Sequence, residues 1–361
     1  MSDLRVLHVA SEIAPWAKTG GLGDVLGSLP AAMARQNPGA FITIAVPLYR
    51  AARAFADANQ HQLEATNLHF QTTLGGHEWS GTFLFFHPQP NLRIAFFDSP
   101  SLFDHKGLYT PAPAPGPNEP SVDNAIRFGV FNLAVLAHLD GLTGGPVDIV
   151  HAHDWHTGIL PWLLAKQRTP PASLMTVHNL AYQGWTAPGM LPELDIDPTE
   201  PIPFLSLGLE HATTITTVSP SYANEIQGPE FGFGLDPILQ AKGVTGILNG
   251  IDDESWSPAT DTYLGAHFDP QDLTGKHTCR QQLLQEFGLP NNDDGACLMG
   301  MVARFDHQKG LDLVAAAVPH LSRLGAKLIV LGTGDPAIEH QFSQLATQYS
   351  EHLAVKIAFD V

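Results

Sequence analysis

Short runs of apolar residues alternate along the chain with longer segments in which apolar residues recur every three or four positions. The first run, Arg5–Ala10, predicts a buried strand, and the apolar spacing from Val25 to Met33 predicts a helix after it. The same patterns predict further strands at Phe41–Pro47, Thr82–Phe86, Leu92–Asp98, Asp148–Ala152, Ala172–Val177, Thr214–Val218 and Thr245–Leu248. They predict helices at Asp123–Leu139, Gly158–Gln167, Phe204–Ala212 and Ser221–Ile226. This alternation indicates an α/β fold, in which a mostly parallel sheet has helices on both faces.

A polar segment, Asp253–Thr274, interrupts this pattern and predicts a linker. The pattern then restarts, with strands predicted at Leu298–Ala303, Lys327–Leu331 and Leu353–Phe359 and helices at Gly310–Leu324 and Ala337–Gln348. We therefore expect one domain over residues 1–250, an interdomain linker over 251–274 and a second α/β domain over 275–361. The last strand has no helix after it, so the second domain is expected to be incomplete. The Pro-rich stretch Thr110–Pro120 predicts a surface loop.

Charge and cysteine content narrow the class of protein. The 361 residues include 36 acidic and 18 basic side chains, a formal net charge of −18, which disfavours nucleic acid and anionic membranes as partners. The cysteines are Cys279 and Cys297, so neither a disulfide framework nor a cysteine-based metal site is expected. No secretory signal and no uncharged apolar run of about 18 residues is present, which predicts a cytoplasmic protein without a membrane span.

A glycine-rich string, Lys18–Asp24 (KTGGLGD), separates the first predicted strand from its helix. Gly20 and Gly21 let a ligand approach the backbone closely, and free N–H groups at a helix N-terminus favour phosphate. Lys18 adds a positive charge beside them. The spacing matches neither G-x-G-x-x-G nor G-x-x-x-x-G-K-[ST], so a tight strand-to-helix turn is the alternative interpretation.

Polar side chains directly follow several of the predicted strands. The carboxyl ends of parallel strands meet at one edge of a sheet, and ligands of α/β proteins bind there. We therefore expect these residues to converge on one rim: Lys18, His153, Asp154, His178, Ser219 and Asn249. Ser219 or Ser221 is also suited to capping the helix that follows.

The segment Asp148–Gly158 is compatible with two kinds of site. Histidine and carboxylate groups are common metal ligands. The candidates here are His151, His153, Asp154 and His156. Trp155 interrupts them, and the spacing is not that of a helical His-Glu-x-x-His site. A polar sugar-binding cleft without a metal is therefore favoured, with Asp154 accepting hydrogen bonds from hydroxyl groups. Thr157, and in part His156, also fit as caps of the next helix.

A second basic site is predicted near the end of the chain. The segment Val302–Asp312 opens a helix after a strand and contains Arg304 and Lys309. Two cations near a helix N-terminus suit a diphosphate, and a solvated surface pair is the alternative. The stretch Leu331–Pro336 (LGTGDP) is a further Gly-rich segment after a strand and predicts a turn.

Long and independent sequence strings occur at Lys18–Asp24, Asp148–Gly158, Thr176–Gly184, Gly246–Asp252 and Val302–Asp312. Together they resemble bacterial glycogen synthases and plant starch synthases, and the resemblance extends from Arg5 to Val361. It implies a GT-B type fold, with two Rossmann-like domains facing a cleft. It also implies a retaining transfer of glucose from ADP-glucose to the non-reducing end of an α-1,4-glucan, with no cofactor and no metal.

The resemblance further implies that Asp154, His178 and Lys18 are the catalytic residues. Asp154 is expected to position the glucosyl unit or stabilise an oxocarbenium-like centre, and His178 to contact the transferred glucose. Arg304 and Lys309 are expected to neutralise the diphosphate of the departing ADP. The implied substrate-binding residues are Lys18, Gly20, Gly21, His153, His156, Asn179, Asn249, Arg304 and Lys309.

The chain departs from the family pattern in some places. His105 and Lys106 stand where Asp-Arg is the commoner pair. Family members also continue into a Glu-Pro-Cys-Gly-Leu segment whose glutamate lies at the catalytic centre, whereas Glu12, Glu225 and Glu230 occur in other contexts. Little turnover is therefore expected of this chain alone. Two alternatives stay open: a non-catalytic remnant that binds glucan or nucleotide, and a related retaining glycosyltransferase that uses UDP-glucose.

Overall fold

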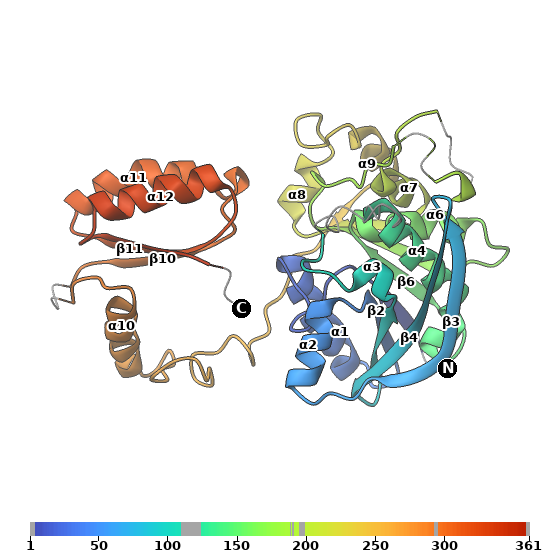
Figure 1. Ribbon diagram of the computed structural model, residues 1–361, viewed down its shortest axis with the longest axis horizontal. Helices are drawn as coiled ribbons and strands as arrows, with labels where there is room; N and C mark the ends of the chain where they lie inside the picture. The colour runs from blue at the N-terminus through green and yellow to red at the C-terminus, as the bar shows by residue number, and fades with distance from the viewer. Residues whose placement is uncertain are drawn as a thin grey trace. The chain divides into compact units, whose positions relative to one another are not determined.

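The computed structural model describes residues 4–109, 124–187, 189, 191–194, 199–291 and 295–358. The loop expected at Thr110–Pro120 lies outside the described residues. The chain divides into two compact units, Met1–Ile251 and Asp252–Val361, which Figure 1 draws from blue to yellow and from yellow to red. Within the described part of the chain, no helix is both long and apolar enough to cross a lipid bilayer.

The first unit is built on a nine-stranded sheet with the order β3-β4-β5-β2-β1-β6-β7-β8-β9. The strands are β1 (Arg5–Val9), β2 (Phe41–Pro47), β3 (Glu64–Leu74), β4 (His77–Gln89), β5 (Leu92–Asp98), β6 (Ile149–His153), β7 (Ala172–Val177), β8 (Thr214–Thr217) and β9 (Thr245–Gly246). In this spatial order, every pair of neighbouring strands from β5 through β2 to β9 is parallel. At the other edge, β3, β4 and β5 form an antiparallel meander. The α/β fold with a large parallel sheet is confirmed, and β3 is an addition to it.

Helices cover both faces of this sheet. In β1 the consecutive side chains from Val6 to Val9 are at most 3% exposed, and successive side chains of a strand point to opposite faces. The helices around the sheet (Figure 1) are α1 (Gly21–Gln36), α2 (Arg50–Ala58), α3 (Pro100–Phe103), α4 (Asn124–Ala137), α5 (Leu139–Thr143), α6 (Ile159–Ala165), α7 (Phe204–His211), α8 (Pro220–Glu225) and α9 (Asp236–Lys242). Two 3-10 turns are η1 (Trp155–Thr157) and η2 (Pro192–Leu194).

The second unit holds a three-stranded parallel sheet with the order β10-β11-β12. Its elements are α10 (Thr274–Glu286), β10 (Leu298–Val302), η3 (His307–Lys309), α11 (Leu311–Arg323), β11 (Lys327–Gly332), α12 (Pro336–Gln348) and β12 (Leu353–Ile357). Figure 1 shows α11 and α12 side by side on one face and α10 on the other. Successive side chains of β11 pack on opposite faces of this sheet. Leu328 and Val330 pack with side chains of α11 and α12, whereas Ile329 packs with Leu284 of α10.

Candidate active site

Topology brings the predicted catalytic segments together at one edge of the first sheet. β6 lies between β1 and β7, and both pairings are parallel. The loop that contains Lys18 therefore begins at the same edge as the turns that carry Asp154 and His178. In the second unit, β10 and β11 are also parallel neighbours, so the segments after them share an edge of that sheet.

Asp154 holds the ends of β6 and β7 together. Its Oδ1 accepts the backbone N–H groups of His178 at 2.7 Å and of Asn179 at 3.3 Å. Burial raises the pKa of the Asp154 carboxyl, while His178 and these backbone N–H groups act to lower it. The carboxylate is therefore oriented by the backbone and is only 8% exposed as a residue.

The backbone of Asp154 adopts a conformation that an L residue rarely accepts. Its φ is 56° and its ψ is −179°, a region that is populated almost only by glycine and costs about 1–3 kcal/mol for other residues. Such strain persists where the surrounding structure enforces it, and it gathers at functional positions. The strain and the oriented carboxylate together make Asp154 the candidate for the centre of the site.

Three imidazoles form a hydrogen-bonded row that ends at His178. The His8 Nδ1 lies 3.3 Å from the His153 Nε2, and the His153 Nδ1 lies 3.1 Å from the His178 Nε2. His8 and His153 are both 0% exposed. Burial lowers the pKa of His8 to about 4 and holds the pKa of His153 well below its usual value. Both rings are therefore neutral near pH 7.

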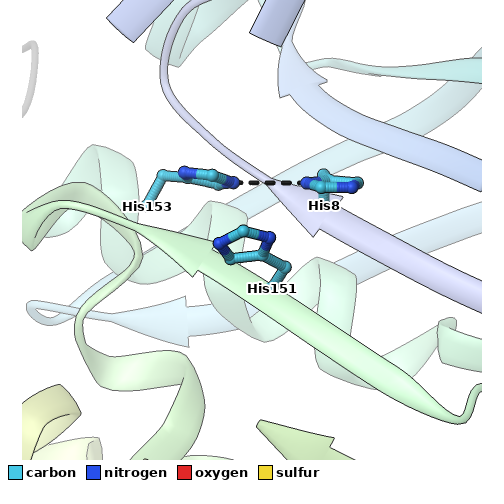
Figure 2. A group of neighbouring side chains, drawn as sticks. All are labelled: His8, His151 and His153. Atoms are coloured by element: carbon cyan, nitrogen blue, oxygen red, sulfur yellow. Dashed lines mark hydrogen bonds between the residues drawn. The ribbon is translucent and has the colours of Figure 1, made fainter. Parts of the chain in front are cut away.

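The metal alternative has a candidate ligand set that the sequence analysis did not assemble. The ring nitrogens of His8, His151 and His153 lie within 4.8 Å of one another (Figure 2), because His8 pairs with His151 across β1 and β6. A histidine ligand binds in its ring plane, but the His151 and His153 rings stack at 4.0 Å with a 29° angle between their planes. The His8 Nδ1 and the His153 Nε2 already face each other in a hydrogen bond, so these atoms act as partners of one another here, and the absence of a metal stays a prediction.

His156 stacks on aromatic side chains, and Thr157 bonds to the backbone at the end of β6. The His156 ring stacks on Trp155 at 4.1 Å and on Tyr109 at 4.7 Å, and burial holds its pKa well below the usual value. The Thr157 Oγ1 accepts the backbone N–H of His153 at 2.7 Å, and no side chain caps α6. The capping prediction for this segment is wrong, because Thr157 bonds back to the end of β6 instead. Whether His156 binds substrate stays a prediction.

Glu12 organises the glycine-rich loop, a role that the sequence analysis missed. Its carboxylate accepts the Thr19 N–H at 2.6 Å, the Thr19 hydroxyl at 2.8 Å and the Gly20 N–H at 3.2 Å, and also the Tyr109 hydroxyl. The Gly20 N–H, which was expected to face phosphate, is therefore already bonded. An acidic residue between a strand and a glycine-rich string was the available signal, since carboxylates bind the N–H groups of such turns.

The glycines of the loop have different surroundings. α1 begins at Gly21, not near Val25 as predicted, so Gly21 and Gly23 lie in its first turn. A Cβ at Gly20 or Gly21 would have nothing within 4 Å, whereas a Cβ at Gly23 would lie 2.5 Å from the Lys18 Cβ. The backbone at Gly20 and Gly21 is open to a ligand, and Gly23 is needed for packing.

Gly23→Ala is therefore expected to destabilise the first unit by about 1–3 kcal/mol through overpacking against Lys18. Gly21→Ala is the matched control, and it should leave the free energy of unfolding unchanged or slightly raised while weakening ligand binding. Urea denaturation and ligand titration of both variants test this. Equal stability of the two variants would contradict the packing role of Gly23.

The remaining predicted residues of the first unit lie where the topology suggests. The Lys18 Nζ forms an ion pair with the Asp24 Oδ1 at 2.8 Å. The Asn179 Oδ1 accepts the Ala181 N–H at 3.1 Å, and Asn249 is exposed after β9. Ser219 caps α8 by accepting the Tyr222 N–H at 3.0 Å, which confirms that prediction.

Arg304 and Lys309 of the second unit flank the turn that precedes α11. The Asp306 carboxylate caps η3 and lies 4.0 Å from the Arg304 Nε, and Lys309 has no ion-pair partner among the described residues. Phe305 forms a β-bridge with Gly334. A Cβ at Gly332 or Gly334 would overlap the backbone carbonyls of this turn, so these glycines allow the two loops to pack closely at one sheet edge.

Comparison with known proteins agrees with this architecture. The starch synthase catalytic domain family matches residues 5–241. A glycogen synthase of Anaeromyxobacter dehalogenans is 39% identical over 99% of this chain and 75% of its own length. A glycogen synthase of Methylococcus capsulatus is also 39% identical, over 99% of this chain and 72% of its own length.

Solved structures extend the match to the whole chain. The catalytic domain of starch synthase IV from Arabidopsis thaliana, bound to ADP and acarbose, covers 100% of this chain with a TM-score of 0.83 and 28% identity. A trehalose-6-phosphate synthase with a TM-score of 0.52 and 15% identity shares the fold alone. Fold and site thus define a glycosyltransferase of the GT-B type. The chain belongs to the glycogen and starch synthase family.

Proposed function

We propose that this chain transfers glucose from ADP-glucose to the non-reducing end of an α-1,4-glucan, with retention of the α configuration. The observation that carries the proposal is the strained, backbone-anchored carboxylate of Asp154 beside His178. Relatives named glycogen synthase and a starch synthase bound to ADP and acarbose support it.

The residues of each unit suit different parts of this reaction. In the first unit, Asp154 positions the glucosyl group and stabilises positive charge at C1, while His178 binds a sugar hydroxyl. In the second unit, Arg304 and Lys309 neutralise the diphosphate as ADP departs. Phosphate oxygens accept the proton of the attacking hydroxyl, so the reaction requires neither a protein base nor a metal. We assign residues 1–250 to acceptor binding and residues 275–361 to nucleotide-sugar binding.

We also propose that the enzyme works in the cytoplasm with small-molecule and glucan substrates. Cys279 and Cys297 are both free thiols, which suits a reducing compartment. The excess of 36 acidic over 18 basic residues leaves only local basic positions, such as Arg304, for an anionic ligand.

Transfer of labelled glucose into glycogen tests the proposal directly. Incorporation from ADP-glucose is expected to exceed incorporation from UDP-glucose and to be lost in Asp154→Asn, which keeps an oxygen that can accept the His178 N–H. Such incorporation would also show that the expectation of little turnover by this chain alone is wrong. Preference for UDP-glucose would favour the related-transferase alternative. Glucan or nucleotide binding without incorporation, in a folded chain, would favour the non-catalytic alternative.

A further inference from the structure

The row of histidines behind His178 is a coupled set of tautomers. A neutral imidazole carries one proton, so each of its two nitrogens has a fixed role as donor or acceptor. His153 uses both nitrogens, one toward His8 and the other toward His178. If its Nε2 accepts from His8, its Nδ1 must donate to His178, and the reverse assignment holds if it donates to His8.

The buried end of the row decides between these assignments. The His8 Nε2 is buried and has no hydrogen-bond partner among the described residues. A buried N–H group without an acceptor is rarer than an under-satisfied acceptor. His8 therefore carries its proton on Nδ1 and donates it toward the His153 Nε2, and His153 then donates from its Nδ1 toward the His178 Nε2.

We propose that His153, anchored by His8, is a positioning residue that holds neutral His178 with its proton on Nδ1. The Nε2 of His178 is then an acceptor inside the protein, and the Nδ1–H, which has no partner among the described residues, is a hydrogen-bond donor. This assignment deepens the proposed function and rests on it for the ligand. In this tautomer the Nδ1–H of His178 donates to an oxygen lone pair, such as that of a sugar hydroxyl.

The neighbouring histidine keeps the row in place without belonging to it. The His151 Nε2 bonds to the Thr176 Oγ1 at 2.6 Å, and that hydroxyl lies 2.6 Å from the Thr216 Oγ1. The His151 ring stacks on His153 at 4.0 Å. Packing thus fixes the plane of the His153 ring, and its hydrogen bonds fix the direction of its protons.

Nitrogen-15 NMR of the full chain, labelled at histidine, reads the tautomers without any need for activity. In the wild type, the His178 signals should report a proton on Nδ1. In His153→Gln, whose amide can replace only the Nε2 contact, His178 should shift toward the Nε2–H form that free imidazole prefers. In His153→Asn, whose amide can replace the Nδ1 contact, the Nδ1–H form should return.

Kinetics provide the second readout. His153→Gln should lower kcat between roughly tenfold and a hundredfold, the range for a misplaced catalytic contact, and His153→Asn should recover part of it. His151→Gln removes the stacked ring but no hydrogen bond of the row, so it should keep the Nδ1–H form of His178 and lower kcat less than His153→Gln does. A wild-type His178 with its proton on Nε2, or equal kinetic losses in His153→Gln and His151→Gln, would overturn the proposal. Correct tautomers without glucosyl transfer would instead refute the proposed function alone.

Discussion

Asp154→Gly is expected to lower glucosyl transfer by about 10²–10³-fold and yet to give a more stable fold than Asp154→Ala. Both substitutions remove the carboxylate, and losing an oriented charge that stabilises the transition state typically costs 10²–10³-fold in kcat. Only the glycine variant also relieves the backbone at φ 56° and ψ −179°. The difference in unfolding free energy between the variants should be that strain, about 1–3 kcal/mol, less the about 0.4–1 kcal/mol by which the greater freedom of the unfolded chain disfavours glycine.

The two variants share the loss of the carboxylate, so their difference reports the strain once the unfolded-state entropy of glycine is allowed for. Each leaves the N–H groups of His178 and Asn179 without the Asp154 acceptor, at about 1–3 kcal/mol for an unsatisfied buried donor. Urea denaturation of the full-length variants measures the difference. If Asp154→Gly were no more stable than Asp154→Ala, the backbone at this position would not be strained and the main argument for its functional role would fail.

Asp154→Asn is a control for the pH dependence of stability that comes from the Asp154 carboxyl. Burial raises the pKa of Asp154 above its unfolded value, so the folded state binds more protons between the two pKa values. The contribution of this group to stability therefore falls as the pH rises from the unfolded pKa through the folded pKa. The amide does not titrate, so Asp154→Asn should lack this part of the pH dependence and should gain in relative stability toward neutral pH.

Strands with continuous apolar runs could be predicted from the sequence alone. The bounds of β5 agree with the prediction because its buried positions hold only apolar residues. The bounds of β7 agree as well, although Ser173 and Thr176 are buried polar residues. β3 was missed because half-buried and exposed positions alternate along most of it and only Leu74 is buried. Such a strand becomes recognisable only through its antiparallel pairing with β4, and the local sequence does not encode this pairing.

The site shows the same division between local and long-range information. The positions of Asp154 and His178 after adjacent strands follow from the order of parallel strands. The bond between His8 and His153 joins residues 145 positions apart, and it depends on the register of β1 and β6, which sequence spacing does not reveal. The role of Glu12 likewise depends on the path of the loop that returns to it.

Arg304→Ala and Lys309→Ala are each expected to weaken ADP binding and to lower kcat/KM for ADP-glucose by about 10²–10³-fold, with the larger loss for Arg304. The guanidinium presents a planar pair of donors to phosphate oxygens, so Arg304→Lys should restore only part of the affinity although it keeps the charge. Lys309 acts as a point charge in the turn before α11. Calorimetric titration of the full chain with ADP measures binding separately from turnover.

Arg323→Ala is the matched control for this experiment. Arg323 lies in the last turn of α11, at the opposite end of the helix from the proposed phosphate site, and bonds to the His320 ring. Its removal changes the net charge by the same amount but should leave ADP affinity within about twofold of the wild type, because salt screens exposed charges beyond about 10 Å. Equal losses in Arg304→Ala and Arg323→Ala would mean that ADP senses the overall charge of this strongly acidic chain, and the assignment of a specific diphosphate site to this turn would then be wrong.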